Sequence, residues 1–510
     1  MRLVVKSICA MTALAGTLAA AAWAEAPVSQ AEKACGALAR VAARDMTVNS
    51  AELKTADSAG NVPSFCEVSA ILRPVKGSAI GVVVRLPEGW NGKLLGLGGG
   101  GWAGNVTLNA AAPNLAAGYA TAQTDGGHAE PDAWNTGWAT LPNGKPNMVA
   151  LEDFSHRAVH LTAIAAKQLI AAYYGKPQSQ AYFHGCSTGG RMALIEAQRY
   201  PEDYDGIIAG APVYTLRTQS TSLLRSVALQ GPDGHLSDAQ ISRIGSAVVK
   251  ACDKNDGIAD GIIGGPSSCK WDPAVLQCPA SGGDAGCLSP GQVKTVRTLY
   301  DGIKTRAGDY AAYPLLRGTE PQWNGPFIGG RTDAARGGMT GLRHAMMGDP
   351  AFDLDRYDAE KDQKALETSG FAKIYQANNP DISRFVARGG KLILWHGTYD
   401  PGPSPVATID HYQQMLRAMQ GKLSPASAKV EDHARLFLAP GVGHCRGGPG
   451  PDRFDLVGAL DAWVEGGHAP ERITASRADT PMTRPLCPYP TQPRYTGKGN
   501  PNDAANFTCG

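Results

Sequence analysis

The sequence predicts an α/β fold in which a mainly parallel sheet is flanked by helices and interrupted by a long insertion. Short apolar runs that are typical of buried strands alternate with segments of helical periodicity near both ends of the chain. The alternation stops after Pro212 and returns at about residue 386. The 510 residues also exceed one ordinary domain. We therefore expect a catalytic core of residues 25–212 and 386–510, with a lid domain inserted at 213–385.

The first 24 residues have the composition of an export signal. Arg2 and Lys6 precede an apolar run that ends in Ala22-Trp23-Ala24, a small-x-small cleavage pattern. The alternative is a short membrane anchor, but the run is shorter than the roughly 20 residues that a membrane span needs. We expect cleavage after Ala24 and export to the periplasm or the medium.

Cysteine content agrees with export, and net charge bears on the kind of partner. Loss of Arg2 and Lys6 lowers the formal net charge from +2 to 0, which gives no reason to expect nucleic acid or a membrane as partner. Of the eleven cysteines, Cys9 lies in the signal, which leaves an even number. No pair or cluster has zinc-site spacing, so we expect disulfides. The oligomeric state is left open.

The elements of the core follow from composition and from the positions of glycine and proline. Expected strands are 80–86, 93–97, 119–124, 180–184, 206–209, 391–395 and 435–438. Expected helices are 157–174, 188–200, 406–419 and 454–465.

Residues 184–190 read HGCSTGG and lie between an expected strand and an expected helix. A G-x-S-x-G motif in that position is typical of the nucleophile elbow of the α/β-hydrolase fold, where a tight turn exposes the serine. The helix that follows favours the negative charge that develops during acyl transfer. Ser187 is therefore the candidate nucleophile. The alternative is a glycine-rich turn with a capping serine.

Two later segments favour catalysis over that alternative. Asp400 follows the strand at 391–395, and His444 follows the strand at 435–438. The order Ser, Asp, His is the order that α/β-hydrolases use. His444 would take the proton of Ser187, and Asp400 would orient the imidazole and stabilise its charged form. His396 is a rival base, but it lies four residues before Asp400 and is expected to line the substrate site.

An oxyanion hole needs two backbone N–H groups. The amide of Thr188, directly after the nucleophile, is the first candidate. The second is Gly98, which opens a run of four glycines after an early strand. A phosphate cradle is the competing interpretation of this run, but no P-loop lysine follows it.

Residues 252–262 (CDKNDGIADGI) combine carboxylates with turn-forming glycines. Oxygen ligands at short intervals suit Ca²⁺, although the spacing is not that of an EF-hand. A solvated acidic turn explains the pattern equally well. Because the loop is remote in sequence from the catalytic segments, an ion here would be structural.

These motifs resemble the tannase and feruloyl esterase family, which also contains mono(2-hydroxyethyl) terephthalate hydrolase. The resemblance covers essentially the whole mature chain and includes the CS, D and HC motifs, the acidic loop and the RPLCPYP segment at 484–490. It implies a lid that binds calcium through the side chains of Asp253, Asp256 and Asp260 and the carbonyls of Ile258 and Ile262. It also implies the disulfides Cys35–Cys66, Cys186–Cys445, Cys252–Cys269, Cys278–Cys287 and Cys487–Cys509.

The resemblance implies a secreted serine hydrolase that cleaves feruloyl or other hydroxycinnamoyl esters through an acyl-enzyme. Galloyl esters and a terephthalate monoester are the alternative substrates, and a non-catalytic periplasmic binding protein is the alternative of another class. Thr188 resembles the feruloyl esterase and tannase pattern, whereas the terephthalate enzyme has an acidic residue there. Aromatic lid residues could stack on the acyl group or form the lid core; they are Tyr310, Tyr313, Trp323 and Phe327.

Overall fold

A computed structural model of the chain shows how these elements are arranged. The residues that it describes are 29–41, 43–57, 61–104, 106–130, 132, 135–218, 233–282, 286–323, 358–423 and 429–510. The expected signal at 1–24 and the lid residue Phe327 lie outside the described residues.

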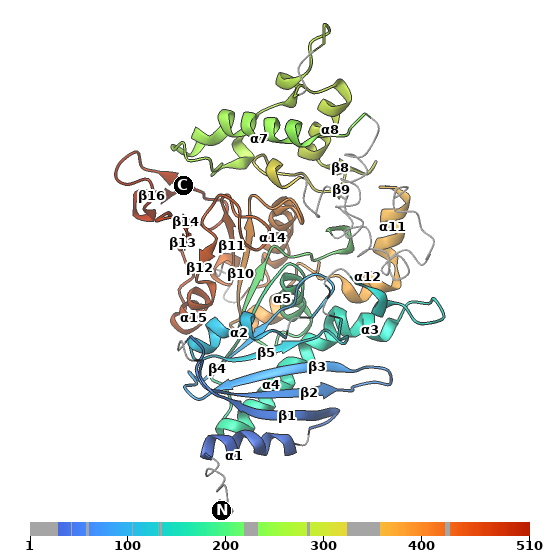
Figure 1. Cartoon of the computed structure of the whole chain (residues 1–510), viewed down its shortest axis with the longest axis vertical. Helices are drawn as coiled ribbons and strands as arrows, with labels where there is room; N and C mark the ends of the chain where they lie inside the picture. Colours follow the sequence, from blue (N-terminus) through green and yellow to red (C-terminus); the bar gives the residue numbers. More distant parts are fainter. Residues whose placement is uncertain are drawn as a thin grey trace, which may run out of the picture.

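A nine-stranded sheet forms the centre of the molecule (Figure 1), with the strand order β1-β2-β3-β5-β4-β6-β7-β10-β11. The first three strands are antiparallel, whereas β4, β5, β6, β7, β10 and β11 run parallel. The α/β fold that the sequence predicts is therefore confirmed. The strands of this sheet are β1 (Met46–Lys54), β2 (Phe65–Leu72), β3 (Ile80–Pro87), β4 (Lys93–Leu97), β5 (Ala120–Thr124), β6 (Gln180–Cys186), β7 (Gly206–Gly210), β10 (Lys391–Gly397) and β11 (Ala434–Ala439).

Helices cover both faces of the sheet, because alternate side chains of each buried strand point to opposite faces. Along β10, Leu392 and Leu394 pack into one apolar cluster, and Ile393 and Trp395 pack into another. The first cluster includes residues of α4, α5 and α14, and the second includes residues of α2 and α15. The bounds are α2 (Leu108–Ala116), α4 (Ala158–Tyr174), α5 (Thr188–Arg199), α14 (Pro405–Met419) and α15 (Leu456–Gly466).

The insertion lies beyond the carboxyl-terminal edge of the parallel strands, with its first part at the top of Figure 1 and its second part at the right. Its first part has an apolar core of its own, built around α7, α8 and the buried Trp323. Its second part packs α11 and α12 against Trp102 and Phe154 of the core domain. The elements are α7 (Asp238–Cys252), α8 (Pro290–Asp301), β8 (Ile303–Lys304), β9 (Tyr310–Ala312), α11 (Lys361–Thr368), α12 (Gly370–Tyr375) and α13 (Ser383–Ala387).

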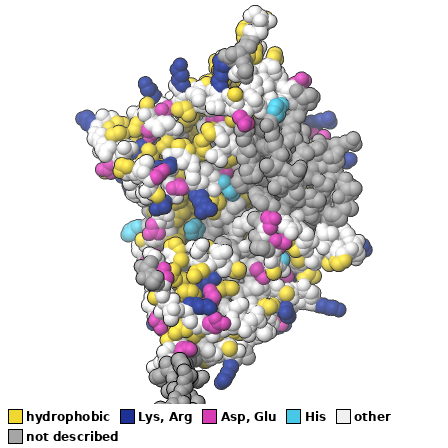
Figure 2. All heavy atoms as spheres, viewed as in Figure 1, with side chains coloured by type: hydrophobic (Ala, Val, Ile, Leu, Met, Phe, Trp, Pro, Cys, Tyr) yellow, Lys and Arg dark blue, Asp and Glu magenta, His cyan; other side chains and the backbone are white. Residues whose placement is uncertain are grey.

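The remaining elements are short and lie at the ends of the chain or beside the sheet. They are α1 (Gln30–Ala37), α3 (Met148–Glu152), β12 (Arg453–Phe454), β13 (Ile473–Ser476), β14 (Thr483–Leu486), β15 (Pro493–Tyr495) and β16 (Phe507–Cys509). On the face drawn in Figure 2, basic and acidic side chains are interspersed over the described residues. Among those residues, none of the helices is both long enough and apolar enough to cross a membrane.

Candidate active site

Ser187 occupies a sharp turn between β6 and α5. Its φ of 63° and ψ of −121° form a strained conformation for a residue with a side chain. The turn closes so tightly that a Cβ on Gly185 would lie 2.3 Å from the carbonyl oxygen of Gly189. Ser187 is the N-cap residue of α5, but its side chain forms no capping hydrogen bond. The geometry is that of a nucleophile elbow rather than of a capping turn.

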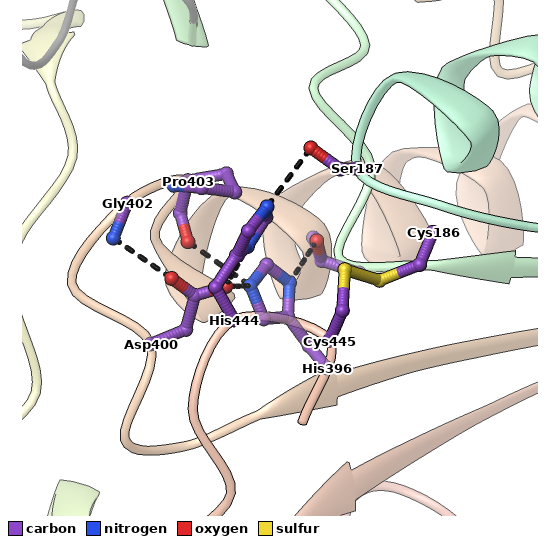
Figure 3. Close-up of a disulfide and its surroundings, with 9 residues drawn as sticks. Cys186, Ser187, His396, Asp400, Gly402, Pro403, His444 and Cys445 are labelled. Atoms are coloured by element: carbon purple, nitrogen blue, oxygen red, sulfur yellow. Dashed lines mark hydrogen bonds and ion pairs between the residues drawn. A yellow bond between two sulfur atoms is a disulfide. The ribbon is translucent and has the colours of Figure 1, made fainter. Parts of the chain in front are cut away.

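The structure brings Ser187, His444 and Asp400 into one hydrogen-bonded chain (Figure 3). Ser187 Oγ lies 2.8 Å from His444 Nε2, and His444 Nδ1 lies 2.7 Å from Asp400 Oδ2. The three residues come from loops that follow β6, β11 and β10, whose carboxyl ends share one edge of the sheet. A serine, an imidazole and a carboxylate at these distances can perform nucleophilic catalysis.

The carboxylate of Asp400 is fully buried and is nevertheless held in its charged form. Burial alone would raise its pKa, but His444 and His396 lower that pKa well below the usual range of an aspartate. The amide of Gly402 donates a further hydrogen bond to Oδ1 at 2.8 Å. The lowered pKa favours the ionised form of Asp400, which is the form that can stabilise an imidazolium.

The position of His396 differs from the expected one. Its side chain is 0% exposed and lies beside the carboxylate of Asp400 (Figure 3). It contacts Asp400 Oδ2 and the side chain of Thr408. A residue with no accessible surface cannot line a substrate site, so that interpretation of His396 is wrong. The sequence does indicate this burial, because alternate residues of a strand point to the same face. His396 therefore shares with Leu392 and Leu394 the face of β10 that packs on α14.

The described cysteines form the five disulfides that the resemblance implies. The bond between Cys186 and Cys445 joins the chain neighbours of Ser187 and His444, with a Cα–Cα distance of 6.0 Å. Figure 3 shows this bond beside the hydrogen-bonded chain. The elbow and the histidine loop are thus tied together covalently at the site.

The two expected oxyanion donors differ in their availability. The amide of Thr188 begins α5 and has no acceptor among the residues that the structure describes, as expected for a first-turn N–H. The amide of Gly98, by contrast, donates to the carbonyl of His184 at 2.9 Å. Gly98 therefore continues the sheet and cannot be the second donor. Its role is close packing, since a Cβ there would lie 2.6 Å from the Cα of Gly189.

The glycines at 99–101, which follow Gly98, remain as candidates for the second oxyanion donor. No described group accepts a hydrogen bond from the amides of residues 99–101. The side chain of Thr188 fixes this segment, because its Oγ1 donates to the carbonyl of Gly101 at 2.7 Å. The sequence motif gave no indication of this second contribution of Thr188.

The acidic loop at 252–262 is closed by its own hydrogen bonds. Asp253 Oδ1 accepts from the amide of Gly261 at 3.0 Å, and Asp256 Oδ1 accepts from the loop backbone. Asp260 Oδ2 pairs with Arg484 at 2.5 Å. The oxygen donors suit calcium chemically, but among the described side chains no group of three or more His, Cys, Asp or Glu is gathered closely enough to hold a metal. Calcium therefore stays a prediction.

The described aromatic residues of the insertion serve packing. Trp323 is fully buried, and its Nε1 donates to Thr319 Oγ1 at 3.1 Å. Tyr313 is mostly buried, its hydroxyl donates to Asp410 Oδ2 at 2.7 Å, and its ring lies 5.1 Å from that of Tyr310. Of the two alternatives for these side chains, lid core and substrate contact, the structure favours the first.

Known proteins similar to this chain are esterases. A probable feruloyl esterase of Arthroderma benhamiae is 33% identical over 452 residues, which is 84% of this chain and 82% of that protein. Mono(2-hydroxyethyl) terephthalate hydrolase of Piscinibacter sakaiensis is 34% identical over 532 residues, or 89% and 86%. An uncharacterized esterase of Xanthomonas campestris is 34% identical over 496 residues, or 88% and 84%. The protein is a carboxylic ester hydrolase, which excludes the non-catalytic binding protein.

Solved structures agree with the fold. Feruloyl esterase B from Aspergillus oryzae superposes with a TM-score of 0.83 at 24% identity, covering 94% of this chain and 100% of that chain. The family model for tannase and feruloyl esterase matches residues 66–510. Sequence motifs, architecture and relatives thus agree, and the chain belongs to the tannase and feruloyl esterase family.

Proposed function

We propose that the protein is a secreted serine esterase that cleaves esters of aromatic acids through an acyl-enzyme on Ser187. The observation that carries the proposal is the hydrogen-bonded chain from Ser187 through His444 to the buried, ionised Asp400. The turn that presents Ser187 and the free amide of Thr188 beside it support acyl transfer in particular.

In the first half-reaction, Ser187 Oγ attacks the carbonyl carbon of the ester while its proton passes to His444 Nε2. The carbonyl oxygen becomes an oxyanion, stabilised by the amide of Thr188 and by an amide of residues 99–101. Asp400 stabilises the imidazolium that forms. Collapse of the intermediate breaks the ester bond, and the leaving alcohol takes the proton from His444. The acyl group stays on Ser187.

In the second half-reaction, a water molecule replaces the alcohol. His444 accepts a proton from the water as its oxygen attacks the acyl carbon, and the same oxyanion donors stabilise the second intermediate. Breakdown releases the free acid and returns the proton to Ser187 Oγ. The products are one alcohol and one carboxylic acid for each ester and water consumed.

Hydroxycinnamate esters are the preferred substrate class. The name of the relative from Arthroderma benhamiae supports them, and the relative from Piscinibacter sakaiensis supports a terephthalate monoester as second candidate. Galloyl esters are a third, because the family model joins tannases and feruloyl esterases. Five disulfides support export to an oxidising compartment.

A direct test compares kcat/KM for methyl ferulate, methyl gallate and mono(2-hydroxyethyl) terephthalate, for the wild type and for Ser187→Ala. We expect methyl ferulate to be the best substrate. The alanine variant should lose about four to six orders of magnitude in turnover, because it removes the nucleophile. Its melting temperature should stay near that of the wild type. Substantial turnover by Ser187→Ala would refute the mechanism, and a different best ester would refute the substrate assignment alone.

A further inference from the structure

His396 is a buried titratable residue that the mechanism above does not use. It lies near the end of β10, where it pairs in register with Leu438 of β11. Its imidazole reaches across the turn that leads from β10 to α14, the turn that carries Asp400. The side chain is 0% exposed, so it takes part in neither solvent contact nor substrate contact.

Each nitrogen of His396 has a defined partner. Nε2 lies 3.1 Å from Asp400 Oδ2 and 3.0 Å from the carbonyl oxygen of Pro403. Nδ1 lies 2.7 Å from the hydroxyl of Thr408 on α14. The imidazole therefore joins the strand, the turn and the following helix, with the catalytic acid among its partners.

The partners determine where the proton of His396 lies. A carbonyl oxygen and an ionised carboxylate both accept hydrogen bonds and cannot donate them. Nε2 must therefore carry the hydrogen, which it shares between Asp400 and Pro403. The hydroxyl of Thr408 can donate to Nδ1, which fixes this tautomer. His396 is thus set to donate to the carboxylate.

Asp400 Oδ2 consequently serves two imidazoles. It lies 2.7 Å from Nδ1 of His444 and 3.1 Å from Nε2 of His396, while Oδ1 accepts from the amide of Gly402. Among the described residues, no lysine or arginine lies within ion-pair distance of Asp400. The titratable side chains in contact with its carboxylate are His444, from the loop after β11, and His396, from β10. A buried charge without such donors is costly.

We propose that His396 is a positioning residue of the esterase, whose Nε2–H keeps the Asp400 carboxylate oriented toward His444 and shares the negative charge of Oδ2. The proposal rests on the proposed function, because it assigns a role within the same triad. His396 acts through Asp400, on the same carboxylate oxygen that contacts His444, and it never touches substrate. A purely structural histidine would only stabilise the turn.

The two roles differ in their effect on pH dependence. When the His396 donor is lost, Asp400 Oδ2 interacts more strongly with the charged form of His444. A higher pH is then needed before His444 loses its proton and can act as the base. The acid limb of kcat/KM should then move to higher pH, by about 0.5 pH unit or more. A structural role would lower the melting temperature and leave the acid limb in place.

The test measures kcat, KM, the acid limb and the melting temperature on the best ester, for three variants. His396→Leu removes the donor, and its kcat should fall about 10- to 100-fold, because misplacing a catalytic group by about 1 Å can cost about 100-fold. KM should change little. His396→Gln keeps an N–H donor and should retain the wild-type acid limb. Thr408→Val removes the hydroxyl that fixes the tautomer of His396. It should shift the acid limb of kcat/KM in the same direction as His396→Leu, but by a smaller amount.

His411 supplies the matched control. It is a second buried histidine, three residues after Thr408 on α14, and it has no hydrogen bond to Asp400. His411→Leu should leave kcat and the acid limb unchanged. The proposal fails if His396→Leu keeps both wild-type values, or if His411→Leu reproduces its effects. Should His396→Leu not fold, an unchanged acid limb in Thr408→Val overturns the proposal by itself.

Ser187→Ala and Asp400→Asn separate this proposal from the proposed function. If either keeps wild-type turnover, the triad itself is wrong. If both lose turnover and the His396 and Thr408 variants do not shift the acid limb, the triad stands and only the role of His396 is refuted.

Discussion

Thr188 contributes to the site through two different atoms. Its amide has no hydrogen-bond acceptor among the described residues, and its hydroxyl donates to the carbonyl of Gly101. The hydroxyl therefore anchors the glycine segment that we propose supplies the second oxyanion donor. A loop of consecutive glycines is otherwise free to adopt many backbone conformations.

Thr188→Val tests this anchor, because valine keeps the shape and the backbone amide but removes the hydroxyl. We expect kcat to fall by about tenfold or more, as the loss of one aligned oxyanion donor costs about 100-fold or more. Thr188→Ser keeps the hydroxyl and serves as the control. Equal activity of the valine and serine variants would show that the Gly101 contact has no effect on catalysis.

The nucleophile elbow and the histidine loop are held together by a disulfide as well as by the sheet. Neither β6 nor β11 alone determines how far its following loop lies from the other, since β7 and β10 separate the two strands in the sheet. The bond between Cys186 and Cys445 crosses that separation directly. The distance between Ser187 and His444 thus depends on a covalent link.

The double variant Cys186→Ala/Cys445→Ala should lose activity more severely than it loses stability, with kcat reduced by about 100-fold. Cys278→Ala/Cys287→Ala removes a disulfide of the insertion and is the matched control. Kinetics and thermal melting of both variants make the comparison. Peptide mapping without reduction gives an independent check. Recovery of Cys186 or Cys445 as a free thiol would show that the two residues are not joined by a disulfide.

The acidic loop is a second element with a testable property. If Asp253, Asp256 and Asp260 hold calcium, excess chelator should lower the melting temperature, because an ion that binds only the folded state stabilises it by mass action. Elemental analysis of the purified protein should find about one calcium per chain. Added Ca²⁺ should restore the original melting curve, whereas Mg²⁺ should not. An unchanged melting curve together with absence of metal would refute the site.

At the scale of the whole molecule, a buried neutral histidine makes stability depend on pH. His411 is buried on α14, and desolvation lowers its pKa from 6.5 to about 4. Above pH 6.5 it is neutral in both the folded and the unfolded chain. Between pH 6.5 and 4 only the unfolded chain takes up the proton, so stability falls as pH falls through this window.

His411→Leu should remove that contribution. Unfolding free energies from urea titrations at pH 7, 5.5 and 4.5 should decline more steeply for the wild type than for the variant, by on the order of 1 kcal/mol per pH unit. Parallel pH profiles would show that His411 is not the cause of the acid sensitivity.

The sequence predicted the parallel core well because buried parallel strands carry continuous apolar runs. The expected strand at 93–97 has the observed bounds of β4, and β6, β7, β10 and β11 differ from expectation by only a few residues. It predicted neither β1, which alternates between partly buried and exposed residues at the edge of the sheet, nor β2, in which buried and partly buried residues alternate. Edge strands carry a weaker apolar signal.

Within the site, motifs identified the three residues that the structure brings together but not the atoms available at each one. Gly98 was expected to be an oxyanion donor, yet its amide is used by the sheet. His396 was expected to line the site, yet its side chain is fully buried and contacts Asp400. Both errors concern the direction in which a group points. The direction of the Gly98 amide depends on where the strand ends, and that of the His396 side chain depends on how the strand packs. Residue order alone does not contain that information.

Cys186 and Cys445 are 259 positions apart, and the chain from one to the other forms a closed ring whose closing disulfide lies beside Ser187 and His444. The insertion belongs entirely to this ring. A single peptide cut anywhere in the insertion therefore leaves both pieces covalently joined, with the nucleophile and its base still attached to one another. A longer or shorter insertion changes the number of residues in this ring and leaves the Cys186–Cys445 disulfide in place. The insertion can thus change in sequence, and substrate preference with it, while Ser187 and His444 keep their spacing.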